Sequence, residues 1–159
     1  MRQGARVPRR LRCTTLRQDQ YAPHRARLAV RSWLGSAHPA LHDTELVASE
    51  LVTNAVRHAL KGPGRDWVRL RLGEGPGEGP GEGLDEAVSC IRLVVTDPGN
   101  PMSEPECLPL PADWNDWIPH MRRPGGMGIA TVAAICEGTW GTYLTEREER
   151  VVWCHVPIR

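Results

Sequence analysis

Two segments near the N-terminus carry apolar residues at helical spacing. In "LRQDQYAPHRARLAVRSWL", residues 16–34, Pro23 suits the first turn of a helix. Its apolar face is predicted to consist of Ala26, Leu28, Ala29, Val30, Trp33 and Leu34. Residues 42–60 repeat this spacing until "KGPG" ends it. We therefore expect two amphipathic helices, separated by the helix-breaking stretch "GSAHP".

The remaining apolar segments alternate or are short. "WVRLRL" and "AVSCIRLVVTD" predict two strands, and "GTWGTYLTE" and "RVVWCHVPI" predict a closing hairpin across "REE". "MGIATVAAIC", residues 127–136, predicts a short apolar helix. The order helix-helix-strand-strand-loop-helix-strand-strand predicts an α+β fold. It would be a two-layer sandwich, with the helices on one face of a mainly antiparallel sheet.

Three segments lack the apolar content of a core. Residues 1–12 are expected to form a disordered basic arm, and residues 13–159 a single domain. "GEGPGEGPGEG", residues 73–83, predicts a loose loop. Residues 98–125 are rich in proline, and a loop of that length in a compact domain is typical of a lid or a binding segment.

Composition limits the class of protein. Hydrophobic residues make up 40% of the chain, and no apolar run approaches the roughly 20 residues that cross a bilayer. The basic N-terminus is not followed by an apolar segment, so we expect no secretory signal and a cytoplasmic location. The five cysteines are odd in number and never spaced CxxC, which argues against a disulfide framework and a zinc site.

Charge is balanced overall but uneven along the chain. The formal net charge is +1, which gives no global signal for nucleic-acid binding. Residues 1–31 nevertheless hold nine arginines and one acid, Asp19. This segment is either a solvated flexible arm or a surface for an acidic partner. Binding of nucleic acid by the arm is a third possibility, which predicts steeply salt-dependent association with DNA.

A polar row interrupts the second helix. At about 100° per residue, Asn54 lies about 40° and His58 about 80° around the helix from Glu50, at the edge of the apolar face. Such a row lines a cleft or forms a solvated border with a local Glu–His contact.

Two further motifs point to a ligand. Asp97 ends an apolar strand and is followed by Pro98 and Gly99, which suits either a plain turn or a carboxylate that accepts a hydrogen bond from a ligand. Gly125, Gly126 and Gly128 lie at the start of the short apolar helix, where backbone N–H groups bind anions. These glycines also suit an ordinary helix start.

In this order the motifs resemble those of the GHKL ATP-binding fold, also called the Bergerat fold. "SELVTNAVRHA" is similar to its N box, "VVTDPGNP" to its first glycine box and "PGGMGIATVAA" to its second. The resemblance covers residues 20–158. It is strongest to the bacterial anti-sigma-factor serine/threonine kinases.

The resemblance implies roles for the polar row and the first box. Asn54 would bind Mg²⁺, for which an amide oxygen is a suitable hard ligand. Glu50 would act as the catalytic general base or orient the attacking hydroxyl. Asp97 would accept a hydrogen bond from the adenine amino group, and Gly99 would let the chain pass the base. His58 is either a phosphate-side contact or a helix residue beside the cleft.

The resemblance also implies roles for the lid's end and the second box. Gly126 and Gly128 would present backbone N–H groups to the phosphates of ATP or ADP. Arg122 and Arg123 would meet the terminal phosphates, unless they are a solvated basic pair.

The chain departs from the family pattern in two places. Pro101 stands where the last glycine of the first box is usual, and proline lacks an N–H and fixes φ. Nucleotide affinity or lid movement is therefore expected to differ. The lid also carries Trp114 and Trp117, which form a protein contact or pack on the lid's own base.

The resemblance implies an ATP-dependent, Mg²⁺-dependent protein serine kinase. Such a protein sequesters a sigma factor, phosphorylates an anti-anti-sigma antagonist, forms a homodimer, and contacts neither nucleic acid nor membrane directly. The alternative is a regulatory module, with or without bound nucleotide, that acts by protein contact only. Glu50 and Asn54 favour the kinase, and Pro101 favours the module.

Overall fold

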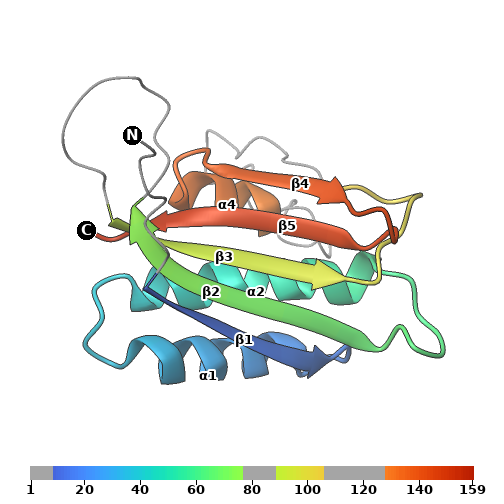
Figure 1. Cartoon of the computed structure of the whole chain (residues 1–159), viewed down its shortest axis with the longest axis horizontal. Coiled ribbons are helices and arrows are strands. Elements are labelled where there is room, and N and C mark those ends of the chain that lie inside the picture. The colour runs from blue at the N-terminus through green and yellow to red at the C-terminus, as the bar shows by residue number, and fades with distance from the viewer. Residues whose placement is uncertain (1–8, 77–88, 106–127) are drawn as a thin grey trace, which may run out of the picture.

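The computed structural model describes residues 9–76, 89–105 and 128–159, which form one antiparallel sheet with helices on one side (Figure 1). The five strands are β1 (Arg9–Arg17), β2 (Trp67–Pro76), β3 (Ser89–Asp97), β4 (Trp140–Leu144) and β5 (Arg150–Pro157), in the spatial order β1-β2-β3-β5-β4. The helices are α1 (Ala22–Leu34), α2 (Leu41–His58) and α4 (Gly128–Ile135). The predicted α+β sandwich is confirmed.

Strand β1 was not predicted, and it begins inside the segment expected to be a disordered arm. It pairs with β2 from Arg12 opposite Leu72 to Arg17 opposite Trp67. It lies at the edge of the sheet and pairs with β2 alone. Basic side chains on an edge strand remain solvated. Leu16 is its single buried apolar side chain, which explains why the alternation was weak in the sequence.

Strand β2 is longer than its apolar pattern suggested. Gly73–Pro76 belong to the strand and pair with Arg92–Ser89 of β3, so the predicted loop does not begin at residue 73. Backbone hydrogen bonds carry the strand past its last apolar side chain, Leu72, because pairing does not require apolar side chains. Residues 77–83 of the predicted loop and 106–125 of the predicted lid lie outside the described residues.

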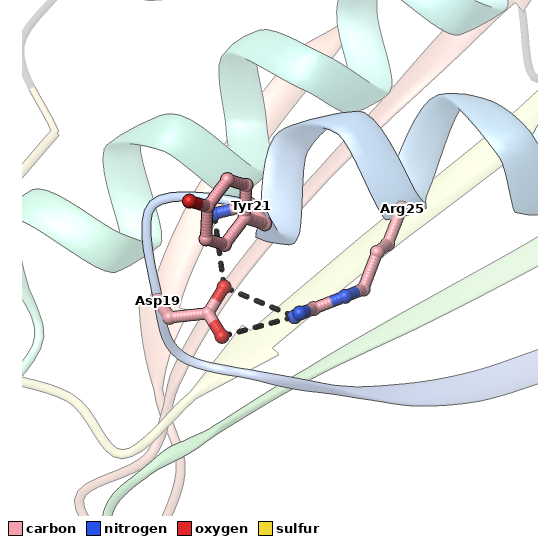
Figure 2. Close-up of polar contacts among 3 residues, drawn as sticks. All are labelled: Asp19, Tyr21 and Arg25. Atoms are coloured by element: carbon pink, nitrogen blue, oxygen red, sulfur yellow. Dashed lines mark hydrogen bonds and ion pairs between the residues drawn. The ribbon is translucent and has the colours of Figure 1, made fainter.

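The connection from β1 to α1 is held by one carboxylate (Figure 2). Asp19 Oδ1 accepts the Tyr21 N–H at 2.9 Å, and both Asp19 oxygens accept from Arg25 Nη1, at 3.0 and 3.1 Å. The first of these satisfies one of the backbone donors that a helix start leaves unpaired. Pro23 occupies the first turn, as predicted.

The core lies between the sheet and the helices. On β2, β3 and β5, alternate residues (Val68, Leu70, Leu72, Ile91, Leu93, Val95, Val152, Cys154 and Val156) join Val47, Leu51 and Val52 of α2 in one buried cluster. Arg31 of α1 makes a two-pronged ion pair with Glu45 of α2, at 2.7 and 3.0 Å. None of the described helices is long and apolar enough to cross a membrane.

Candidate functional site

A small open pocket lies where the C-terminal part of α2 meets the ends of β3 and β5. Its empty volume is about 210 Å³, including open solvent. The lining residues are Asn54, His58, Ala59, Asp97, Asn100, Ser103, Pro105 and Arg150.

Asp97 is the buried carboxylate of this pocket. Its Oδ1 accepts the Gly99 N–H at 2.7 Å. Burial raises the pKa of Asp97 to about 6, against the opposing effects of the Gly99 hydrogen bond and the charge of Arg150. A carboxylate has about four acceptor positions, so one backbone hydrogen bond leaves Asp97 able to accept from a ligand donor.

Gly99 is required by the turn itself. Its φ of 76° lies in the left-handed region, and a Cβ at this position would overlap the carbonyl oxygen of Glu148 in the β4–β5 turn. The Gly99 carbonyl accepts the Leu60 N–H at 2.9 Å. The need for glycine here is therefore explained by packing inside the protein.

Pro101 occupies a position that favours proline. Ser103 N–H donates to the Asn100 carbonyl at 3.1 Å, which makes residues 100–103 a β-turn with proline second. Asn100 Oδ1 also accepts the Met102 N–H at 3.0 Å. Proline in place of the usual glycine at position 101 thus makes the turn beside the pocket stiff.

His58 joins this turn to the end of α2. Its Nδ1 lies 3.1 Å from Ser103 Oγ, and its carbonyl accepts from Asn100 Nδ2 at 3.0 Å. The imidazole therefore lines the pocket while contacting the segment that follows β3. The local Glu–His contact, one of the two alternatives for the polar row, is not formed between the described residues, and the imidazole contacts Ser103 instead.

Arg150 is a pocket residue that belongs to none of the sequence motifs. It is the first residue of β5 and pairs with Asp97 of β3, and it is 7% exposed. Its Nη1 lies 3.4 Å from Thr142 Oγ1, its Nη2 lies 3.4 Å from the Ser103 carbonyl, and its Nε is buried without a hydrogen-bond partner. Arg150 Nη1 also forms an ion pair with the exposed Glu104, at 3.7 Å, and the charge of Arg150 lowers the pKa of Asp97.

The side chain of Glu50, on α2, lies beside the beginning of α4, and Glu50 is not one of the residues that line the pocket. A Cβ on Gly128 would lie 2.7 Å from Glu50 Oε2, so the carboxylate rests against the first residue of that helix. A side chain at position 128 would therefore displace the Glu50 carboxylate. The sequence placed both residues in one site, and the structure brings these two together.

The predicted site residues fall into two groups. Asn54, His58 and Asp97 share the pocket, and Gly99 forms the turn next to it. Arg122, Arg123 and Gly126 lie outside the described residues, as do Trp114 and Trp117.

Within the described part of the chain, no cluster of three or more His, Cys, Asp or Glu residues could hold a metal. Asn54 offers one amide oxygen, and Mg²⁺ is usually held by one or two protein ligands together with substrate phosphates.

Comparison with known families matches residues 15–153 to the histidine kinase-like ATPase domain. The matched range contains Glu50, Asn54, Asp97, Gly128 and Arg150. No curated protein matches the chain.

Proposed function

Because the chain belongs to the histidine kinase-like ATPase family, we propose that it binds ATP and ADP in the pocket between α2, β3 and β5. The observation that carries this proposal is the convergence of Asn54 and Asp97, which are distant in sequence, on one pocket. Family membership supports nucleotide binding of the GHKL type, usually with Mg²⁺.

The chemistry of the residues present fits a purine nucleotide. Asp97 would accept a hydrogen bond from the exocyclic amino group of adenine, which selects adenine over guanine. The Asn54 side-chain oxygen would contribute to a Mg²⁺ site. When bound, the magnesium nucleotide supplies an activated phosphoryl group whose charge the metal offsets.

We further propose that the protein is a serine/threonine kinase of the anti-sigma-factor type. Glu50, beside the first residue of α4, would accept the proton of a substrate serine hydroxyl or orient that hydroxyl. Arg122 and Arg123 would interact with the terminal phosphate, and the backbone at Gly126 and Gly128 would donate to the phosphates.

The proposed partners are a sigma factor and an anti-anti-sigma antagonist. The protein would hold the sigma factor by direct contact and release it according to the phosphorylation state of the antagonist. A homodimer in the cytoplasm is the proposed assembly.

A contact-only regulatory module is the second candidate, and the Pro101 turn favours it. Residues 99–103 are fixed by hydrogen bonds to Leu60 and His58. This turn restricts the backbone at the point where the family pattern has a flexible glycine. Such a protein would regulate without phosphoryl transfer.

Incubation with labelled Mg-ATP and a candidate antagonist protein tests the kinase. We expect phosphoserine on the antagonist, loss of transfer in Glu50→Gln, and unchanged ADP affinity in that variant. Nucleotide binding without transfer to any antagonist would support the contact-only module. A folded protein that binds no nucleotide would contradict the proposal as a whole.

A further inference from the structure

The sheet has one face that no described helix covers. In Figure 1 the strands lie in front of α2 and α4, with this outer face toward the viewer. Strand pairing assigns to it the residues that alternate with the core positions. On β2, β3, β4 and β5 they include Trp67, Arg69, Arg71, Arg92, Val94, Gly141, Tyr143, Val151, Trp153 and His155.

This outer face is positively charged. Arg69, Arg71 and Arg92 lie on the two adjacent strands β2 and β3, and the outward positions of the paired strands carry no acid. None of the three takes part in an ion pair between described residues. Arg71 Nε is buried without a hydrogen-bond partner. A protein with a net charge of +1 therefore concentrates cationic groups on one surface.

The same face offers apolar surface next to those charges. Val94, on the central strand β3, is only partly buried and lies opposite Trp153 of β5. The Trp153 indole rests on Gly141, where a Cβ would lie 2.8 Å from the ring. Tryptophan, tyrosine and arginine around a partly exposed apolar centre are the residues that dominate the energy of protein interfaces.

The arrangement of these groups discriminates among occupants. A second copy meeting the face by two-fold symmetry would bring its own arginines against these three, and like charges repel. The face of the Trp67 indole is taken by Arg69, at 5.1 Å, and the Trp153 indole packs on β4, so each ring is already stacked on a protein group. A single-stranded nucleic acid would match the charge, but these aromatic faces are already occupied and leave none free for base stacking. An acidic polypeptide supplies both carboxylates for the arginines and apolar side chains for Val94 and Trp153.

We propose that the outer face is a docking surface for an acidic segment of a partner protein. The carboxylates of that segment pair with Arg69, Arg71 and Arg92, and its apolar side chains pack on Val94 and Trp153. The surface lies on the opposite side of the sheet from the pocket, so this proposal does not depend on nucleotide binding.

Fluorescence polarisation with labelled 20-residue peptides tests the proposal. The probes are an acidic peptide of Asp, Glu and Leu, a basic peptide of Lys and Leu, and a (dT)20 oligonucleotide. We expect the acidic peptide alone to bind, with affinity that falls as salt rises. Binding should weaken at least about tenfold in Arg71→Glu/Arg92→Glu. Arg147→Glu, with the same kind of change in the exposed β4–β5 turn, should leave binding unchanged.

A second measurement keeps the test valid if the double variant fails to fold. Backbone amide NMR shifts of the wild-type protein, titrated with the acidic peptide, should change on β2, β3 and β5 and not on α1. No binding, or binding that the double variant does not alter, would overturn the proposal. So would binding of (dT)20 without binding of the acidic peptide, or a dimer, measured by sedimentation equilibrium, that dissociates in Arg92→Glu.

Discussion

The side chain of Glu50 occupies the space that a side chain at position 128 would need, and residue 128 is a glycine. A Cβ on Gly128 would lie 2.7 Å from Glu50 Oε2, closer than such atoms approach in proteins. The carboxylate on α2 and the start of α4 are therefore positioned by each other. This relationship gives a role to a glycine that serves equally as an ordinary helix start.

Gly128→Ala should reduce phosphoryl transfer without unfolding the protein. The added methyl displaces the flexible end of Glu50, and a displacement of about 1 Å costs up to roughly a hundredfold in rate. Alanine in a helix changes the free energy of unfolding by only about 1 kcal/mol. Transfer rates and urea denaturation measure the two effects.

The control is the double variant Glu50→Ala/Gly128→Ala. If the glycine acts through Glu50, the double variant should be no slower than Glu50→Ala alone. Fully additive losses would contradict this coupling.

Adenosine affinity should rise with pH through about 6. The pKa of Asp97 is raised to about 6 by burial, so the acceptor form for the adenine amino group predominates only above that pH. Affinity should increase roughly tenfold between pH 5 and pH 7 in calorimetric titrations, and adenosine avoids the titration of phosphates. Asp97→Asn should bind weakly at both pH values, and a pH response retained in that variant would exclude Asp97 as its source.

The raised pKa of Asp97 also makes the stability of the folded protein depend on pH. The folded-state pKa of Asp97 lies above its usual value of 3.8, so the folded protein retains a proton that the unfolded chain releases between pH 4 and 6. The contribution of Asp97 to stability is therefore present at low pH and lost as pH rises through about 6. From pH 4 to pH 7, the free energy of unfolding of Asp97→Asn should rise by about 2 kcal/mol relative to that of the wild type, as measured by urea denaturation. An equal difference at both pH values would contradict the shift.

Arg150→Met should destabilise the protein by about 1–3 kcal/mol. The substitution removes the ion pair with Glu104, the contacts to Thr142 and Ser103, and a positive charge near the buried Asp97. In Asp97→Asn/Arg150→Met the cost should fall, because no buried carboxylate remains. Urea denaturation at pH 7.5 measures both, and Arg147→Met in the exposed turn should change stability by less than about 0.5 kcal/mol.

Gly99→Ala should destabilise more than a matched glycine substitution. Gly64 has nearly the same φ, 74° against 76°, but an added Cβ there meets nothing within 4 Å. Gly64→Ala should therefore cost only about 1–2 kcal/mol of backbone strain. At Gly99 the overlap with Glu148 adds about 1–3 kcal/mol. Equal losses in the two variants would show that the turn relaxes.

The sequence was sufficient for most of the fold because its elements have strong periodic patterns. Both amphipathic helices, the apolar β3 strand and the β4–β5 hairpin were predicted, since burial of one face imposes a regular spacing on the residues. β1 escaped because an edge strand with one buried side chain, Leu16, lacks that spacing. The extension of β2 through Gly73–Pro76 escaped because backbone pairing, not side-chain burial, defines it.

The site was less predictable where it depends on strand pairing. Asn54 and Asp97 carry a local signal, a polar row on a helix and an acid at a strand's end. Arg150 carries none, because a charged residue at the start of a hairpin strand is ordinarily solvated. Its place opposite Asp97 follows only from the register of β3 with β5. A prediction of that pairing would have identified it.

Calorimetric titration of Mg-ADP into the wild-type protein, Asp97→Asn and Asn54→Ala tests whether this pocket binds the nucleotide. We expect one site per chain, with weaker binding in both variants, while Arg147→Met binds as the wild type does. The two affected residues come from α2 and β3 and meet only in the pocket. A folded wild-type protein that shows no binding, or variants that bind as tightly as the wild type, would show that this pocket is not the nucleotide site.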